Sequence, residues 1–384
     1  MPSLAIFATH PIQYYAPLYR ELARVGDLHL EVFYGRLPTA AEQGEGFGVP
    51  FQWDVDLLSG YEHRLGDGAL DGLASDLRSH RWDALLLHGW HHPLERRFME
   101  HARRGGVPVL VRGDTHLRAP RPWWRRLARE VTLRRRLAHY AGCLAVGTWN
   151  EEFYRHFGVP SERIFRSPHC VDHAFFRAEV ARLAPRREAL RAAWGAGPGE
   201  TLAAFVGKFI PEKGASDFVA ALGLAARGGA SIRGVLVGDG PLRAEAETLA
   251  RSLASPVTFS GFLNQSRMAE AYVAADVVVL PSLSETWGLV VNEALACGKP
   301  CFVSDRVGCA PDLILPGVTG AVFPYGNRTA LAELLARFSE GKMRFSPDSR
   351  VWTEIVGRHS CTAAATGIAE AVRHFGRHGF PKTP

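Results

Sequence analysis

The chain has 384 residues, more than a single hydrophobic core of ordinary size accommodates, so two domains are expected. Hydrophobic residues make up 47% and charged residues 22%, a balance that excludes an intrinsically disordered chain. The formal net charge of +6 is modest and diffuse, so no nucleic-acid partner is expected.

Short apolar runs alternate with segments of helical periodicity from the first residues onward. In the first half of the chain, strands are predicted at 4–8, 28–34, 83–88, 107–112, 143–147 and 164–168. The same rhythm restarts after a Pro- and Arg-rich segment at 183–187. In the second half, strands are predicted at 201–207, 231–238, 257–261, 276–281, 300–304 and 320–324. This alternation predicts βαβ units and mostly parallel sheets.

Two doubly wound, Rossmann-like α/β domains are the simplest interpretation. They are expected at residues 1–180 and 195–355, followed by a C-terminal helical segment at 356–384. Ligands of open α/β sheets bind at the carboxyl ends of the strands. The chemistry is therefore expected in a cleft between the two domains.

The most specific segment is PSLSETWGLVVNEALACGKPCFVSD, residues 281–305, which follows a predicted strand. If its helix begins near Gly288, Glu285 lies in the preceding loop and Glu293 lies about one and a half turns into the helix. A carboxylate accepts two hydrogen bonds and so matches the vicinal diol of a ribose or a sugar. Gly288 would let N–H groups at the start of the helix approach a diphosphate. Two solvated helix glutamates are the ordinary alternative.

Two lysines form a second cluster in GKFIPEKG. Lys208 lies just past a predicted strand and Lys213 at the start of a helix, where two cations could neutralise a leaving diphosphate without a metal. A pair of solvated loop lysines is the alternative. Further along, Gly238 opens the turn GDGP after the next strand. In VTFSGFL, three residues lie where a nucleobase could rest against backbone groups: Gly261, Phe262 and Leu263.

Taken in order, GKFIPEKG, GDGP, FSGFL and ETWGLVVNE followed by ALACGKP resemble glycosyltransferase family 4, a large family of retaining glycosyltransferases with the two-domain GT-B fold. The similarity covers about residues 201 to 325. It implies a UDP- or GDP-linked sugar as co-substrate, a hydroxyl-bearing acceptor, and no metal or other cofactor. In such a fold the C-terminal helix is expected to cross back to the first domain.

The resemblance also assigns roles. It places Glu293 at the ribose, Glu285 at the donor sugar, and Lys208 and Lys213 at the diphosphate. Backbone groups near the donor would come from Gly207, Thr286, Trp287, Gly288 and Leu289. The first basic residue is usually arginine in this family, so Lys208 cannot provide a bidentate phosphate contact.

In the first domain the resemblance is weaker. Polar residues stand at the predicted strand ends: His10, Gln13, Tyr14, His88, Asp114 and His116. The opening ATHPIQYY replaces a Gly-rich loop that is common in the family. Asp114 and His116 follow VLVR, where family members carry a residue beside the reacting carbon that orients the acceptor or takes its proton. We therefore favour Asp114 and His116 over His88. For each of them, a polar side chain satisfied at a strand end is the alternative.

Two further patterns point to other partners. Asp54-Val55-Asp56 has the spacing of a metal-binding DxD motif, but QWDVDLLSGY alternates like an edge strand, so no metal is expected there. The segment Arg118–Arg136 is rich in arginine and contains Trp123 and Trp124. Such a helix could rest on an anionic membrane. A solvated arginine face is the alternative.

No stretch reaches the roughly 18 apolar residues of a membrane span, and the N-terminus lacks the features of a signal peptide. The six cysteines have no paired spacing and are expected to be small buried side chains. The sequence thus indicates a cytoplasmic glycosyltransferase of cell-surface polysaccharide or glycoconjugate synthesis. A sugar-nucleotide epimerase of the same fold and a non-catalytic nucleotide-sugar binding protein are the alternatives.

Overall fold

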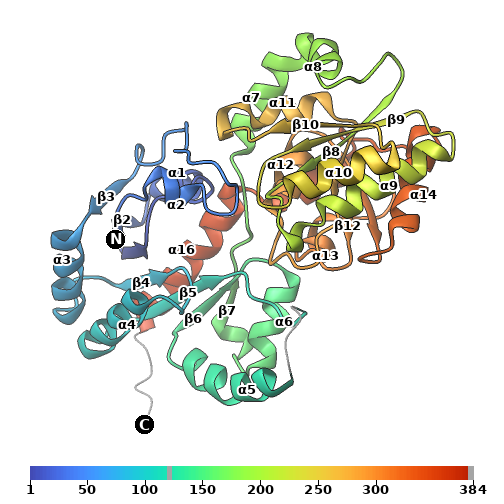
Figure 1. The fold of residues 1–384 in the computed structure, drawn as a ribbon. Coiled ribbons are helices and arrows are strands. Elements are labelled where there is room, and N and C mark those ends of the chain that lie inside the picture. Colours follow the sequence, from blue (N-terminus) through green and yellow to red (C-terminus); the bar gives the residue numbers. More distant parts are fainter. Residues whose placement is uncertain (119–122, 379–384) are drawn as a thin grey trace. The chain divides into compact units, whose positions relative to one another are not determined.

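The computed structural model describes residues 1–118 and 123–378, with side chains for 1–118 and 129–375. The chain forms two compact units (Figure 1). Unit 1 contains Met1–Pro38, Asp56–Val171 and the C-terminal segment from His359, and unit 2 contains Thr39–Val55 and Asp172–Arg358. The expected first domain, 1–180, extends past the end of unit 1 at Val171. It also includes Thr39–Val55, which belongs to unit 2.

Unit 1 is built on a parallel seven-stranded sheet with the order β3-β2-β1-β4-β5-β6-β7. Its strands are β1 (Ser3–Ala8), β2 (His29–Tyr34), β3 (Glu62–Leu65), β4 (Ala84–Leu87), β5 (Val109–Gly113), β6 (Gly142–Ala145) and β7 (Ile164–Arg166). Side chains of β1 alternate between two cores. Leu4 and Ile6 pack in the core on one face of the sheet, and Ala5 and Phe7 pack in the core on the other.

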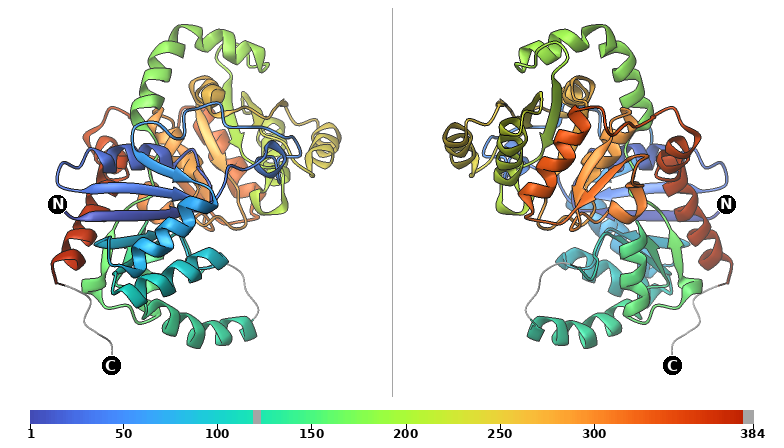
Figure 2. Two further views of the ribbon diagram at one scale, coloured as in Figure 1. Left: turned by 90° about the vertical axis from the view of Figure 1, so that its left-hand side faces the viewer. Right: turned by 90° about the vertical axis from the view of Figure 1, so that its right-hand side faces the viewer.

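The helices of unit 1 cover both faces of this sheet. They are α1 (Tyr15–Ala23), α3 (Asp67–Arg78), α4 (Pro93–Gly105), α5 (Trp123–Leu137), α6 (Thr148–His156) and α16 (Cys361–His378). Helix α16 packs against α1 and against β6 and β7, and Figure 2 shows it in red beside these elements. Helix α16 thus returns to the first sheet, as expected.

Unit 2 is built on a parallel six-stranded sheet with the order β10-β9-β8-β11-β12-β13. Its strands are β8 (Thr201–Val206), β9 (Ile232–Val237), β10 (Val257–Gly261), β11 (Val277–Leu280), β12 (Cys301–Ser304) and β13 (Gly320–Phe323). Its helices are α2 (Ala40–Gln43), α7 (His173–Leu183), α8 (Arg187–Ala193), α9 (Ala215–Arg227), α10 (Arg243–Leu253), α11 (Gln265–Ala274), α12 (Leu289–Ala296), α13 (Ala310–Leu313), α14 (Arg328–Ser339) and α15 (Arg350–Arg358). The prediction of two doubly wound parallel-sheet domains is confirmed.

One predicted strand is wrong. Residues 52–61 form a loop rather than an edge strand, and the edge strand is β3. All four residues of β3 are exposed, so this strand lacks the apolar alternation that would have revealed it. The six cysteines are buried free thiols, as expected. Within the described residues, no helix is long and apolar enough to cross a membrane.

Candidate functional site

The strand order of unit 2 reverses beside β8, which has β9 on one side and β11 on the other. The strands are parallel, so the loops that follow β8 and β11 diverge from the same edge of the sheet. Such a switch point is where open α/β sheets bind ligands. Lys208 and Lys213 follow β8, and Glu285 follows β11.

Lys213 and Glu285 form an ion pair across this switch point. The loop with Lys213 packs closely against the loop after β11. Gly214 has φ +73°, and a Cβ there would lie only 2.5 Å from the carbonyl oxygen of Pro281. Only a residue without a side chain fits this approach. The structure thus brings together a predicted cation and a predicted carboxylate that are far apart in the sequence.

Glu293 lies on α12 and accepts a hydrogen bond from the hydroxyl of Tyr272 on α11. Burial raises the pKa of Glu293 to about 7, although the hydrogen bonds from Tyr272 and Gln265 act in the opposite direction. The ionised carboxylate is therefore available near neutral pH and is lost below it. Tyr272 had not been predicted as a partner, and no sequence pattern marks it.

Lys208 has different neighbours from Lys213. Its ammonium donates a hydrogen bond of 2.7 Å to the carbonyl oxygen of Glu45 and lies 5.0 Å from the ring centre of Phe47. Burial lowers the pKa of Lys208, the charge of Lys213 lowers it further, and the charge of Glu45 acts in the opposite direction. Within the described part of the chain, Lys208 forms no ion pair with an acidic side chain. Its positive charge is thus the less compensated of the two.

The predicted glycine turns lie at the ends of the neighbouring strands. The N–H of Gly207, after β8, donates to the carbonyl of Val237, and the N–H of Gly238 donates to the carbonyl of Gly261. A Cβ at Gly238 would lie 1.9 Å from the carbonyl oxygen of Gly207, and φ is +137°. Phe262 and Leu263 come directly after Gly261, the last residue of β10. Leu263 is buried and Phe262 is partly buried.

The loop before α12 is held in one conformation. The N–H of Gly308 donates to the carbonyl of Glu285 at 3.0 Å, and the N–H of Cys309 donates to the carbonyl of Trp287 at 2.9 Å. The indole of Trp287 is buried and donates to Asn292 at 2.8 Å. Thr286 is exposed in the same loop. The buried side chain of Trp287 therefore cannot contact the nucleotide sugar, and the predicted contact would have to come from its backbone.

The helix start at α12 has the expected form. Gly288 is the N-cap with φ +101°, and Leu289 is the first helical residue. The first N–H groups of an α-helix have no partner inside the helix and carry the positive end of its dipole. This start is suited to an anionic or hydroxyl-bearing ligand.

Unit 1 has its own switch point, between β1 and β4. There Tyr15 stacks on His88 with ring centres 4.1 Å apart, and Tyr19 lies within hydrogen-bond distance, 2.7 Å from His88 Nε2. Burial lowers the pKa of His88 well below its usual value, and the charge of Arg112 lowers it further. His88 is therefore a neutral ring. Tyr14 packs edge-on to Tyr15 at 4.6 Å.

Asp114 lies beside this cluster and pairs with His169, whose Nε2 is 3.8 Å from a carboxylate oxygen. His169 is buried whereas 41% of the Asp114 side chain is exposed, so the carboxylate can meet a ligand while the imidazole orients it. Burial lowers the pKa of His169, and the hydrogen bond to Asp114 opposes that effect. Tyr14 lies edge-on to His169 at 6.1 Å.

The other predicted residues of unit 1 have separate surroundings. His116 is buried, accepts the backbone N–H of Arg118 at 3.1 Å and packs edge-on to Trp149. His10 lies 3.0 Å from the hydroxyl of Thr9, and Gln13 is partly buried in the same loop. Of the favoured pair, Asp114 is therefore the residue that the structure joins to the switch-point cluster.

Sequence reasoning missed Arg112 and His169. Arg112 is 1% exposed and donates to the carbonyls of Ser167 and Pro168 at 3.3 and 2.8 Å. Its Nη1 is buried and has no hydrogen-bond partner in the described structure. The available signals were a charge at the end of the apolar run VLVR and a histidine in SPHCVD. Arg112 fixes the segment that carries His169.

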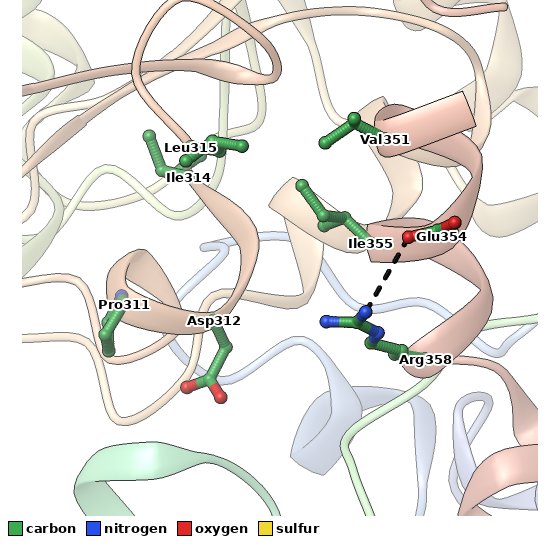
Figure 3. A pocket seen from close by; sticks show the side chains of 8 residues that line it. All are labelled: Pro311, Asp312, Ile314, Leu315, Val351, Glu354, Ile355 and Arg358. Carbon is green, nitrogen blue, oxygen red and sulfur yellow. Dashed lines mark ion pairs between the residues drawn. The ribbon is translucent and has the colours of Figure 1, made fainter. Parts of the chain in front are cut away.

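Figure 3 shows a separate hollow of about 250 Å³ between α13 and α15. It is lined by Pro311, Asp312, Ile314, Leu315, Val351, Glu354, Ile355 and Arg358. Glu354 and Arg358 form an ion pair of 3.7 Å on its wall. None of the predicted site residues is among the eight, so this hollow adds nothing to the candidate site.

The predicted membrane contact at Arg118–Arg136 falls partly outside the described residues, because Trp123 and Trp124 belong to the part without described side chains. Of the described arginines, Arg118 lies 4.3 Å from the ring centre of Trp149, and Arg134 pairs with Glu130 at 3.6 Å. Arg134 on α5 and Arg118 before this helix therefore both have partners within unit 1.

Two doubly wound units with polar switch points define the GT-B fold. Accordingly, the structure titled Anabaena Alr3699/HepE in complex with UDP and glucose matches with a TM-score of 0.68, covering 96% of this chain and 99% of that chain at 16% identity. Residues 186–354 match the family model Glycosyl transferases group 1. The resemblance to a glycosyltransferase domain is thus confirmed for residues 186–354, whereas family 4 and retention stay predictions.

Two curated glycosyltransferases are similar to this chain in sequence. A GDP-mannose-dependent alpha-mannosyltransferase of Mycobacterium tuberculosis is 33% identical over 273 residues, which are 67% of this chain and 64% of the relative. An alpha-D-kanosaminyltransferase of Streptomyces kanamyceticus is 28% identical over 229 residues, 59% of this chain and 58% of the relative. The chain thus spans about three fifths of the length of these relatives.

Proposed function

We propose that the chain is a glycosyltransferase that moves a sugar from a nucleoside-diphosphate sugar to a hydroxyl group of an acceptor. The observation that carries the proposal is the cluster of Lys208, Lys213 and Glu285 at the switch point of a Glycosyl transferases group 1 domain. The names of the curated relatives support the same activity.

In the proposed reaction, the bond between the anomeric carbon and the diphosphate oxygen breaks while a bond to the acceptor oxygen forms. Lys208 and Lys213 stabilise the charge of the leaving diphosphate, so no metal is required. Glu285 contacts the donor sugar, and Glu293 accepts hydrogen bonds from the ribose. The start of α12, at Gly288 and Leu289, adds backbone N–H groups.

Asp114 is the proposed acceptor-side residue. Its exposed carboxylate, oriented by His169, would hold the acceptor hydroxyl or take its proton. We further propose that the sugar keeps its anomeric configuration, in line with the family 4 resemblance, and that no side chain becomes a covalent nucleophile. The donor is proposed to be UDP- or GDP-linked, since one relative is named for GDP-mannose and HepE was solved with UDP.

The acceptor is proposed to be a glycan, a lipid-linked saccharide or a small hydroxyl compound of cell-surface polysaccharide or glycoconjugate synthesis. A cytoplasmic location and a peripheral membrane contact through Arg118–Arg136 stay predictions. Sedimentation with anionic liposomes at physiological salt tests the contact, and failure to co-sediment contradicts it.

A donor screen followed by an acceptor screen tests the function. UDP- and GDP-sugars that raise the melting temperature are incubated with a panel of acceptors, and glycosylated product is measured. Lys213→Ala is expected to lower turnover about 100-fold or more, because one cation of the leaving-group site is lost. Lys342→Ala, which removes a surface lysine paired with Glu340 in the same unit, is the matched control. Isomerisation of the donor without acceptor indicates an epimerase, and binding without any transfer indicates a binding protein; either result overturns the proposal.

A further inference from the structure

The segment Thr39–Val55, here called the strap, leaves unit 1 after Pro38 and packs with unit 2. It contains the short helix α2 and the DxD-like residue Asp54. The strap contacts the loops that follow β8, β9 and β10, and each of these loops contains candidate donor residues. Neither the predicted domain boundaries nor the family motifs gave this segment a role.

Polar contacts anchor the end of the strap beyond β10. Asp54 accepts hydrogen bonds from the backbone N–H of Ser266 at 3.0 Å and from its hydroxyl. The side-chain amide of Asn264 donates to the carbonyl of Gln52 at 2.6 Å. Asp54 therefore ties the strap to the start of α11. These bonds join residues that are 212 positions apart in the sequence.

Aromatic packing anchors the middle of the strap. The ring of Phe262 lies 5.0 Å from that of Phe47 and 4.4 Å from that of Phe51. Such pairs contribute stability beyond the apolar area that they bury. The strap is thus fixed to the residue after β10 that the sequence placed near the nucleobase.

Between these anchors, the turn at Glu45–Phe47 encloses the side chain of Lys208. The carbonyl of Glu45 accepts its ammonium proton at 2.7 Å, and Phe47 presents its ring face 5.0 Å away. Gly46 has φ +81°, and a Cβ there would lie 3.0 Å from Lys208 Cδ and 3.2 Å from Nζ. The left-handed φ favours glycine, and a side chain at this position would press on the lysine and displace it.

The two direct contacts of the Lys208 ammonium carry no formal charge, while the carboxylate of Glu45 acts on it electrostatically and raises its pKa. A carbonyl and an aromatic face attract a cation but carry no formal negative charge. An ammonium has three N–H donors, and the carbonyl of Glu45 uses one. Lys213, in contrast, already faces the carboxylate of Glu285. Lys208 is thus held in place with donors and charge still available to an anion.

We propose that the turn Glu45–Phe47 is a positioning element of the donor site, which holds Lys208 in the orientation that binds the diphosphate of a nucleoside diphosphate. This inference rests on the proposed function, because it takes the ligand of Lys208 to be the donor. Glu45 acts through its backbone, Gly46 by lacking a side chain and Phe47 through its ring.

Two glycine variants of the strap form a matched pair. Gly46→Ala places a Cβ against Lys208, whereas Gly48 has a similar φ of +73° and a Cβ there would only reach 3.8 Å from Gly240 Cα. Both variants carry the same kind of backbone strain, but one alone touches the lysine. Phe47→Leu keeps the apolar contact with Phe262 and removes the ring face, and it serves as a second variant if Gly46→Ala does not fold.

The experiment measures binding of UDP, GDP, uridine and guanosine by calorimetry. Gly46→Ala is expected to weaken binding of the diphosphate about 10-fold, since part of a charge-assisted hydrogen bond is lost, while Gly48→Ala stays within about 2-fold. Binding of the nucleoside is expected to stay unchanged in both. In a Lys208→Ala background, Gly46→Ala is expected to cause no further loss, because the two changes act on one interaction.

Several outcomes contradict the positioning role. Equal effects of Gly46→Ala and Gly48→Ala indicate strain alone, and an undiminished effect of Gly46→Ala without Lys208 indicates that the lysine is not the target. Tighter diphosphate binding in Gly46→Ala or Phe47→Leu shows that the strap blocks the lysine instead. If the wild-type protein binds neither UDP nor GDP, the proposed function itself fails, which separates the two hypotheses.

Discussion

Glu293 links the pH dependence of folding to that of ligand binding. Burial raises the pKa of this carboxyl from 4.5 to about 7. Between these pH values the folded chain binds more protons than the unfolded chain, so the free energy of unfolding falls as the pH rises. The difference of about 2.5 pH units corresponds to about 3 kcal/mol at about 1.4 kcal/mol per unit. The full effect is reached above pH 7 and is absent below 4.5.

Glu293→Gln removes the charge but keeps an oxygen that can accept the hydrogen bond of Tyr272. The variant is therefore expected to exceed the wild type in free energy of unfolding by about 2 to 3 kcal/mol at pH 8, with almost no difference near pH 4.5. Urea unfolding at four or more pH values measures this difference. Glu333→Gln, at an exposed position of α14, is the control and should follow the wild type. A difference that stays constant from pH 5 to 8 would refute the reasoning about burial.

The same group should control the affinity for the donor. If only the ionised carboxylate accepts the ribose hydroxyls, the competent fraction rises from about one tenth at pH 6 to about nine tenths at pH 8, a gain of about 10-fold in affinity. The phosphate groups titrate in the same range, so the Glu293→Gln variant supplies the baseline. Calorimetry with UDP or GDP at both pH values is the assay. Equal pH dependence in the wild type and the variant would show that Glu293 does not meet the ribose as a carboxylate.

Two further predictions concern the switch point of unit 2. Removing either Lys213 or Glu285 leaves an uncompensated, partly buried charge, so the double alanine variant should be more stable than additivity predicts by about 1 to 2 kcal/mol, measured by urea unfolding. A coupling of zero would mean that the pair is not formed in solution. Gly238→Ala should destabilise the protein by about 3 kcal/mol or more, because its φ of +137° is strained for alanine and its Cβ would lie 1.9 Å from the Gly207 carbonyl oxygen. Gly199→Ala, with φ +75° and open space, should lose only about 1 kcal/mol in the same urea unfolding measurement; similar losses would point to backbone strain alone.

The sequence determined the features that depend on local pattern. Apolar period and turn residues predicted the strands of both sheets, and the order of the motifs around Lys208, Gly238 and Glu285 indicated a Glycosyl transferases group 1 domain. These signals are local because strands and helices alternate side chains with a fixed period. The exposed strand β3 lacks alternating apolar residues and was not predicted. Residues 52–61 have such an alternation but form a loop.

The tertiary structure alone decided the partners of the charged side chains. Asp54 was expected in an edge strand, yet it lies in a loop and accepts a hydrogen bond from the backbone of Ser266, 212 residues away. His169 orients Asp114, and Tyr272 shares a hydrogen bond with Glu293, although no pattern in the chain joins these pairs. Hydrogen bonds and burial depend on which distant segments come into contact in the folded chain. The local spacing of apolar residues does not predict those contacts. The motifs of the chain therefore indicate the kind of domain. The surroundings of its charged side chains depend on neighbours that only folding brings close.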